Sequence, residues 1–149
     1  MHDMSERTGA TRAVRETTSF RFPQTLVQRL DRRAGNLGVT RTTLAERFLE
    51  EGLRLVEHPG IAFRDGASGE RRAAISGSRL DVWMVVEVVR ANGGIEGAAD
   101  YLEVPAHGIE AAARYYAAYP DEIDEEIRQN NEYAEREMQL DAERRRLLG

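Results

Sequence analysis

The 149-residue chain contains no cysteine, so neither a disulfide nor a zinc site with Cys ligands can hold its fold. It also contains no lysine, and all 21 cationic side chains are Arg, the side chain that binds phosphates and base edges with two parallel hydrogen bonds. No apolar run approaches the roughly 20 residues that cross a bilayer, and the polar N-terminus has no signal-peptide apolar region. We therefore expect a soluble, cytoplasmic protein.

The sequence lacks the patterns of an enzyme. His2, His58 and His107 are isolated, with no second histidine at the spacing of a metal site on a helix. There is no phosphate-binding loop, nucleophile elbow or dinucleotide fingerprint, because GASGE and ANGG read as short turns. We expect no catalytic residue, no metal and no cofactor.

Charge is distributed unevenly along the chain. Residues 1–58 hold 10 Arg against 8 acidic residues, residues 59–119 hold 6 against 8, and residues 120–149 hold 5 against 10. The corresponding charges are +2, −2 and −5, so the N-terminal segment is the basic one. Residues 1–16 are rich in Ser, Thr, Arg and Gly and lack apolar periodicity, which predicts a disordered arm.

Residues 17–22 alternate between polar and apolar side chains, which predicts a short strand. Phe20 and Phe22 share one face, and Thr17, Ser19 and Arg21 share the other. A lone strand is unstable in water, because its backbone groups need a ladder and its rings need a surface to cover them. No nearby segment offers a partner, so we expect antiparallel pairing with the same segment of a second copy.

Two helices are predicted after this strand. Pro23 suits the first turn of the first helix, and Gly38 provides its C-terminal stop. Thr40 can cap the second helix, which His58-Pro59 ends. Apolar residues keep helical spacing in both; they are Leu26, Val27, Leu30, Ala34 and Leu37, then Leu44, Ala45, Phe48, Leu49, Leu53 and Val56.

The SFRFP stretch, the leucine-patterned first helix, the GVTR turn and the helix start TRTTL resemble the ribbon-helix-helix family of bacterial DNA-binding proteins, which includes VapB-type antitoxins. The resemblance covers residues 17 to about 56. It implies a dimer whose paired strands enter the DNA major groove, while the second helix presents its N-terminus to a phosphate. The DNA-binding residues would be Thr17, Ser19, Arg21, Thr40, Arg41 and Thr42. The alternative is that the polar strand face is only the solvated side of a dimerisation ribbon.

A second unit is predicted from residue 59. IAFR and RRAAI flank the turn-rich DGASGE, which predicts a hairpin over residues 61–75. Asp81 can cap a following helix, although its β-branched content leaves a strand as the alternative; the apolar positions are Val82, Trp83, Val85, Val86 and Val89. IEGAADYLEVPAHGIEAAARYYAAYP predicts a helix-turn-helix with Pro105 opening its second helix. Its closely packed or inward-facing residues would be Ala98, Ala99, Leu102, Val104, Ile109, Ala112 and Tyr116.

Residues 59 to about 128 resemble a small DUF-type antitoxin domain. Its Gly-Thr-Arg-Ile/Leu motif is matched here, with Ser in place of Thr, and its Ala/Tyr-rich closing helix is matched near residue 115; the matching residues are Gly77, Ser78, Arg79, Leu80, Val82, Ala113, Tyr115, Tyr116, Tyr119 and Pro120. Arg79 either fixes the loop by bonding to carbonyls or a carboxylate, or touches a ligand. Residues 106–119 offer only Arg114 against Glu110, so we expect this unit to dimerise or dock a partner rather than read DNA.

Residues 120–149 are predicted to form one long helix, with acidic residues at its start and Arg at its end. Its apolar stripe is too narrow for an independent core; the residues are Ile123, Ile127, Ala134, Met138 and Leu147. The helix must lie on the second unit, project as a solvated rod, or be covered by another protein, which is the interpretation that we favour.

The predicted fold is therefore mainly α: a ribbon-helix-helix dimer at 17–58, a small hairpin plus helix-turn-helix domain at 59–119, and a C-terminal helix at 120–149. The two resemblances imply an antitoxin of a type II toxin–antitoxin pair that represses its own operon. Its partners would be operator DNA, a PIN-like ribonuclease toxin and a second copy of the chain, in a dimer or a higher oligomer, without a membrane. The expected toxin-binding residues are Ile127, Ala134, Arg136, Met138, Arg144 and Arg145. The alternatives are a stand-alone ribbon-helix-helix repressor and a dimeric interaction scaffold that does not bind DNA.

Overall fold

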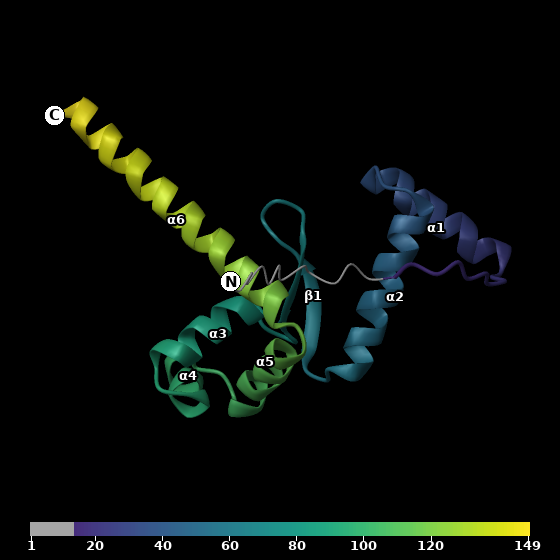
Figure 1. Cartoon of the computed structure of the whole chain (residues 1–149), viewed down its shortest axis with the longest axis horizontal. Coiled ribbons are helices and arrows are strands. Elements are labelled where there is room, and N and C mark those ends of the chain that lie inside the picture. The colour runs from purple at the N-terminus through teal and green to yellow at the C-terminus, as the bar shows by residue number, and fades with distance from the viewer. Residues whose placement is uncertain (1–13) are drawn as a thin grey trace, which may run out of the picture. The chain divides into compact units, whose positions relative to one another are not determined.

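The computed structural model describes residues 14–149. The predicted arm at 1–16 lies outside these residues except for 14–16, which have no regular secondary structure. As predicted, the described chain is mainly helical, with six helices and one two-stranded antiparallel sheet (Figure 1). It divides into two compact units, one ending at Ala45 and the other running from Glu46 to Gly149, so the boundary falls inside a helix.

The first helices begin and end where the sequence predicts. Helix α1 (Gln24–Leu37) starts after Pro23 and stops at Gly38, whose φ of 67° is the left-handed conformation that glycine adopts at little cost. Helix α2 (Arg41–Glu57) starts after Thr40, whose Oγ1 accepts a hydrogen bond from the Thr43 N–H at 3.1 Å. The predicted stop and cap are therefore confirmed.

Residues 17–22 have no regular secondary structure in the single chain. The rings of Phe20 and Phe22 stack with centroids 5.8 Å apart, yet 65% of Phe20 and 51% of Phe22 remain exposed. A strand here requires a partner segment, and that pairing stays a prediction.

The second unit contains the predicted hairpin. Strands β1 (Ile61–Asp65) and β2 (Arg71–Ile75) pair antiparallel, with Ile61 opposite Ile75 and Phe63 opposite Ala73. Asp81 precedes the next helix, but the predicted side-chain cap is wrong. Its carboxylate instead accepts hydrogen bonds from Arg64 Nε at 2.6 Å and Trp83 Nε1 at 3.1 Å. The buried Asp81 thus ties the hairpin to the helix, because a guanidinium stabilises a carboxylate more than one free N–H does.

Four helices follow the hairpin: α3 (Val82–Ala91), α4 (Ile95–Leu102), α5 (Ala106–Ala118) and α6 (Pro120–Leu148). The strand alternative for Val82–Ala91 is wrong, because the valines repeat with helical spacing and bury one face of α3. The α4–α5 pair lies at the predicted helix-turn-helix, and Pro105 directly precedes α5 as expected.

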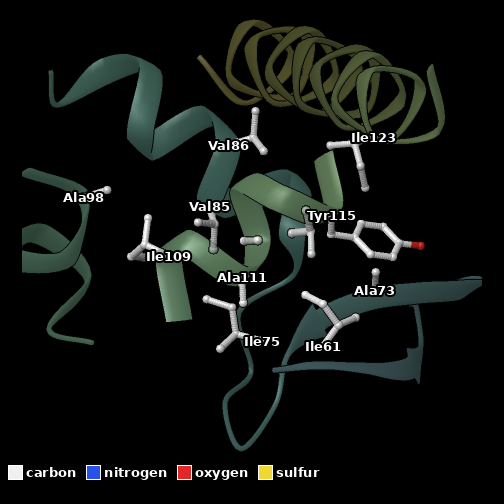
Figure 2. Packing of buried hydrophobic residues seen from close by; sticks show 12 residues of the cluster. Ile61, Ala73, Ile75, Val85, Val86, Ala98, Ile109, Ala111, Tyr115 and Ile123 are labelled. Atoms are coloured by element: carbon white, nitrogen blue, oxygen red, sulfur yellow. The ribbon is translucent and has the colours of Figure 1, made fainter. Parts of the chain in front are cut away.

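The core of the second unit lies between the hairpin and helices α3, α4 and α5, with the start of α6 closing it (Figure 2). Tyr115, Ile109 and Ile123 are its largest fully buried side chains. Figure 2 shows the Tyr115 ring lying between Ile123 of α6 and Ala73 of β2. The first turns of α6 therefore belong to this core, whereas residues 131–140 are exposed throughout.

Candidate functional site

The C-terminal half of α2 turns a polar face toward its own unit. Arg54 donates hydrogen bonds to the Tyr115 hydroxyl at 2.6 Å and to Glu122 Oε1 at 3.0 Å, and its guanidinium lies 3.8 Å from the centre of the Tyr119 ring. The Tyr115 hydroxyl donates to Glu122 Oε2 at 2.8 Å. This cluster ties α2, α5 and α6 together by charge-assisted hydrogen bonds rather than by apolar contact.

A cavity of about 220 Å³ lies beside this cluster. On its rim, Arg71 of β2 donates to Glu51 of α2 at 2.6 Å and to Asp65 of β1 at 2.9 Å. Three Arg and three Glu side chains balance one another around it, so it offers no net charge to select an ionic ligand; its lining is Arg47, Glu50, Glu51, Arg54, Phe63, Arg71, Ala73 and Glu122. We interpret this cavity as part of the polar contact that joins α2 to the hairpin and to α6.

The opposite face of α2 is apolar and bare. At about 100° per residue, Phe48, Leu49, Leu53 and Val56 fall within one half of the helix, away from Arg54. All four are exposed, including 58% of Leu53 and 81% of Val56, whereas Leu44 near the helix start is buried. A helix normally buries its apolar stripe and solvates its polar one. In the single chain this arrangement is reversed on α2, and exposed apolar patches are typical of surfaces that contact another molecule.

The predicted base-reading residues Thr17, Ser19 and Arg21 are all exposed. They precede α1 and lie in the segment that contains the stacked Phe20 and Phe22 rings. In the single chain nothing fixes their register.

The predicted phosphate contact at the start of α2 is partly occupied by internal bonds. Arg41 donates from Nε and Nη2 to the two carboxylate oxygens of Asp31, both at 2.6 Å. The hydrogen bond from Arg41 lowers the pKa of Asp31, so the pair stays ionised at neutral pH. The Thr40 hydroxyl already accepts the capping hydrogen bond from the Thr43 N–H, and Thr42 is exposed. A phosphate would therefore meet backbone N–H groups, the Thr42 hydroxyl and a guanidinium already held by Asp31.

The six residues expected to bind a toxin divide between two faces of α6. Ile127, Ala134, Met138 and Arg145 continue the line that starts at the buried Ile123. Arg136 and Arg144 lie nearer the opposite side, about 180° and 260° round from Ile127. Leu147, which we predicted on the same stripe, lies about 200° round the helix from Ile127, so its place on that stripe is wrong.

The charges on α6 are mostly paired within the helix. Arg128 binds Glu125 and Glu132, and Arg144 binds Asp141 at 3.1 Å. Arg145 binds the same Asp141 at 2.5 Å. The hydrogen bond from Arg128 lowers the pKa of Glu125 to about 2. All these pairs are exposed and can exchange at little cost.

The motif loop before α3 is fixed by Ser78 rather than by Arg79. Ser78 Oγ donates to the Ile75 carbonyl at 2.9 Å and accepts from the Leu80 N–H at 3.1 Å. Arg79 is exposed and makes no hydrogen bond or ion pair within residues 14–149. The loop-fixing alternative for Arg79 is therefore wrong in the described chain.

One buried carboxyl has an unusual environment. Glu126 of α6 lies 3.4 Å from Arg72 of β2, and 12% of its side chain is exposed. Burial raises the pKa of Glu126 to about 7, against the opposing charge of Arg72. Within residues 14–149, Glu126 Oε2, Arg72 Nη1 and Glu70 Oε2 are buried without a hydrogen-bond partner. The ion pair is thus too poorly aligned to offset its own desolvation.

Within the described chain, no three His, Cys, Asp or Glu side chains are grouped to hold a metal ion. His58 packs edge-on against the rings of Tyr115 and Tyr119, at 5.3 and 5.5 Å between ring centres. No helix among residues 14–149 has the length and apolarity to cross a membrane.

Comparison with known proteins found no matching family model, no matching curated protein and no matching solved structure.

Sequence reasoning missed the polar face of α2 as a packing surface. Arg47, Glu50, Glu51 and Arg54 recur with helical spacing, which was the available signal. A polar stripe on a helix usually faces water, so nothing in the spacing distinguished a docked stripe from a solvated one.

Proposed function

We propose that this chain is a dimeric DNA-binding antitoxin that represses its own operon and neutralises a ribonuclease toxin. The observations that support it best are the bare apolar face of α2 and, separately, the uncovered Phe20–Phe22 pair. Both features are what a ribbon-helix-helix protomer presents before its twin covers them. The polar face of α2 is already used by its own unit, so the apolar face is the one left for a partner.

A second copy of the chain is the simplest partner that could bury Phe20, Phe22 and the apolar face of α2. Two antiparallel 17–22 segments would satisfy each other's backbone groups, and four helices would close over the Phe rings. Burying each large apolar side chain contributes about 1.5–3 kcal/mol, so several from each copy can offset the cost of association.

Paired ribbons would turn Thr17, Ser19 and Arg21 toward the DNA major groove. Arg21 can bind guanine O6 and N7 with two hydrogen bonds, whereas the two hydroxyls discriminate less. The N-terminus of α2 adds a phosphate contact through its free N–H groups and Thr42.

The second unit, chiefly through α6, would bind the toxin, a PIN-like ribonuclease. The Ile127–Met138 line supplies an apolar contact. The Arg144–Arg146 cluster would lie over the acidic, metal-binding cleft expected of such a nuclease, after Arg144 and Arg145 exchange their Asp141 partner.

DNA binding is tested by titrating the full chain with the DNA upstream of its own coding sequence at several salt concentrations. Arg21→Ala should weaken binding to that DNA by about 1–3 kcal/mol, while Arg32→Ala, which removes a cation from α1, should have little effect. An equal loss on scrambled DNA would mean that Arg21 touches only phosphate. Absence of salt-dependent binding would leave a dimeric scaffold as the function.

Toxin neutralisation is tested by co-expression with a ribonuclease encoded beside this gene. The full chain should rescue growth, and a chain ending after Arg128 should not, because it lacks most of α6. Full rescue by the shortened chain would remove α6 from the toxin contact. DNA binding without any neutralised nuclease would leave a stand-alone repressor.

A further inference from the structure

The distal half of α6 carries a second apolar line, distinct from the Ile127–Met138 line. Tyr133, Leu140 and Leu147 are seven residues apart, so they lie on one side of the helix. All three are exposed. In Figure 1 this part of α6 extends beyond α3, α4 and α5 of the same unit, and none of these helices covers it.

Seven charged residues border this line, and most have no partner. Glu132 binds Arg128, and Arg144 binds Asp141. The other four make no hydrogen bond or ion pair within residues 14–149; they are Arg136, Glu137, Glu143 and Arg146. Elsewhere on α6, Arg128 and Arg145 are paired within the helix, so both α6 arginines without a partner among the described residues border this line.

We propose that this line pairs antiparallel with the same line of a second copy, with Leu140 against Leu140 on a twofold axis. In that alignment Tyr133 meets Leu147 of the second copy. Each bordering charge except Asp141, which is paired with Arg145 in its own helix, then meets an opposite one across the contact; the pairs are Glu132 with Arg146, Arg136 with Glu143, and Glu137 with Arg144. The twofold axis repeats each pair.

The charge pattern selects the antiparallel direction. In a parallel pair of helices, the residue just before each apolar position lies next to the residue five positions later in the second copy. Glu132 would then lie beside Glu137 of the second copy, and the two carboxylates would repel. Antiparallel packing also sets opposite ends of the two helix dipoles side by side. The sign of each charge therefore specifies both the partner and its direction.

This contact uses none of the residues assigned to DNA, to the bare α2 face or to the Ile127–Met138 line, but it shares Arg136, Arg144 and Arg146 with the expected toxin contact. It buries three apolar residues from each copy, so it is weak alone and depends on concentration. Combined with a twofold contact through α1 and α2, it would join dimers into tetramers.

The absence of cysteine makes a direct test simple. In the full chain, Leu140→Cys should form a disulfide-linked dimer under mild oxidation, because only residues with close Cα atoms can be bridged. Met138→Cys is the matched control, since residue 138 lies about 160° round the helix. A mixture of Tyr133→Cys and Leu147→Cys chains should give the mixed disulfide, and neither should give its own.

The proposal is overturned if Leu140→Cys links no faster than Met138→Cys, the result expected if another protein covers this line. It is also overturned if Tyr133→Cys and Leu147→Cys each link only to themselves, which would indicate a parallel pair. Loss of DNA or toxin binding would not affect either readout, so failure of the proposed function stays distinguishable.

Charge exchange provides an independent measurement. On the Leu140→Cys background, Glu137→Arg should slow cross-linking about tenfold, because it makes two symmetric pairs repulsive. Adding Arg144→Glu should restore the rate. Glu135→Arg, placed on the other side of the helix, is the control and should leave the rate unchanged. Failure of the double exchange to restore the rate contradicts the alignment.

Discussion

At the scale of single residues, Arg54 and Tyr115 show how a charged side chain can stabilise the edge of a hydrophobic core through hydrogen bonds. The Tyr115 hydroxyl accepts a hydrogen bond from Arg54 and donates one to Glu122. Burial, together with the Glu122 carboxylate, raises the pKa of Tyr115, so the hydroxyl remains a donor at any ordinary pH. The ring itself fills the core (Figure 2).

Tyr115→Phe should therefore lower the free energy of unfolding by about 1–2 kcal/mol, because Arg54 and Glu122 lose a partly buried partner. Tyr116→Phe is the matched control, since its hydroxyl also bonds to an Arg and a carboxylate but in exposed positions. We expect a change of about 0.5 kcal/mol or less there. Chemical denaturation measures both, and equal effects would contradict the role given to the buried cluster.

Glu126 makes the second unit sensitive to pH. The charged groups that act on it are Arg72 on β2, Glu122 one turn earlier and Asp81. The pKa of Glu126 rises from an ordinary value of 4.5 to about 7 in the folded chain. Between these values the folded state binds more protons than the unfolded state, so this group's contribution to stability falls as pH rises and is lost above pH 7.

Glu126→Gln should raise the free energy of unfolding by about 1–2 kcal/mol at pH 8 and leave it nearly unchanged at pH 4, after allowance for solvent screening. Glu135→Gln, an exposed change on the same helix, should follow the wild-type profile. Chemical denaturation at pH 4 and pH 8 measures the free energy of unfolding of each variant. A constant difference between Glu126→Gln and wild type would show that Glu126 ionises normally.

At the scale of elements, the helix ends were predictable because they depend on local chemistry. Gly38 supplies the left-handed residue after α1, and Thr40 supplies the hydroxyl that caps α2. Asp81 was not predictable in the same way. Its position before α3 indicated a cap, but its carboxylate binds Arg64 of the distant strand β1 and the Trp83 side chain in the first turn of α3 instead.

Gly38→Ala should lower the free energy of unfolding by about 1 kcal/mol, because a Cβ is disfavoured at a φ of 67° although no atom lies within 4 Å of it. Gly35→Ala, three residues earlier inside α1 and equally uncrowded, should instead raise stability by up to about 1 kcal/mol. The opposite signs, measured by thermal denaturation, separate backbone strain from crowding. Two changes of the same sign would argue against the left-handed C-cap.

At the scale of the whole molecule, α2 is the element through which we propose that copies associate. Its apolar face remains exposed, and its polar face binds the second unit. The two bare surfaces on α2 and α6 lie on different elements, so each can be removed separately.

Leu53→Glu should abolish association through α2, because an ionised carboxylate cannot be buried at an apolar contact without a partner. We expect the dissociation constant for this contact to rise at least about 100-fold, leaving only the weaker association through α6. Gln28→Glu adds the same charge to α1 and should have little effect. Sedimentation equilibrium measures both, and an unchanged mass for Leu53→Glu would refute the dimer through α2.

The sequence by itself determined the helices, the hairpin and the ends of most elements, because periodicity, capping residues and turn residues act over a few positions. Only the tertiary structure decided which face of α2 is buried. The apolar stripe of α2 shows only that some surface must cover it. The polar residues Arg47, Glu50, Glu51 and Arg54 repeat with equally regular helical spacing, so spacing does not show which face packs against the rest of the chain. Long-range bonds from Arg54 to Tyr115 and from Arg71 to Glu51 turn the polar face inward, and no local pattern encodes them.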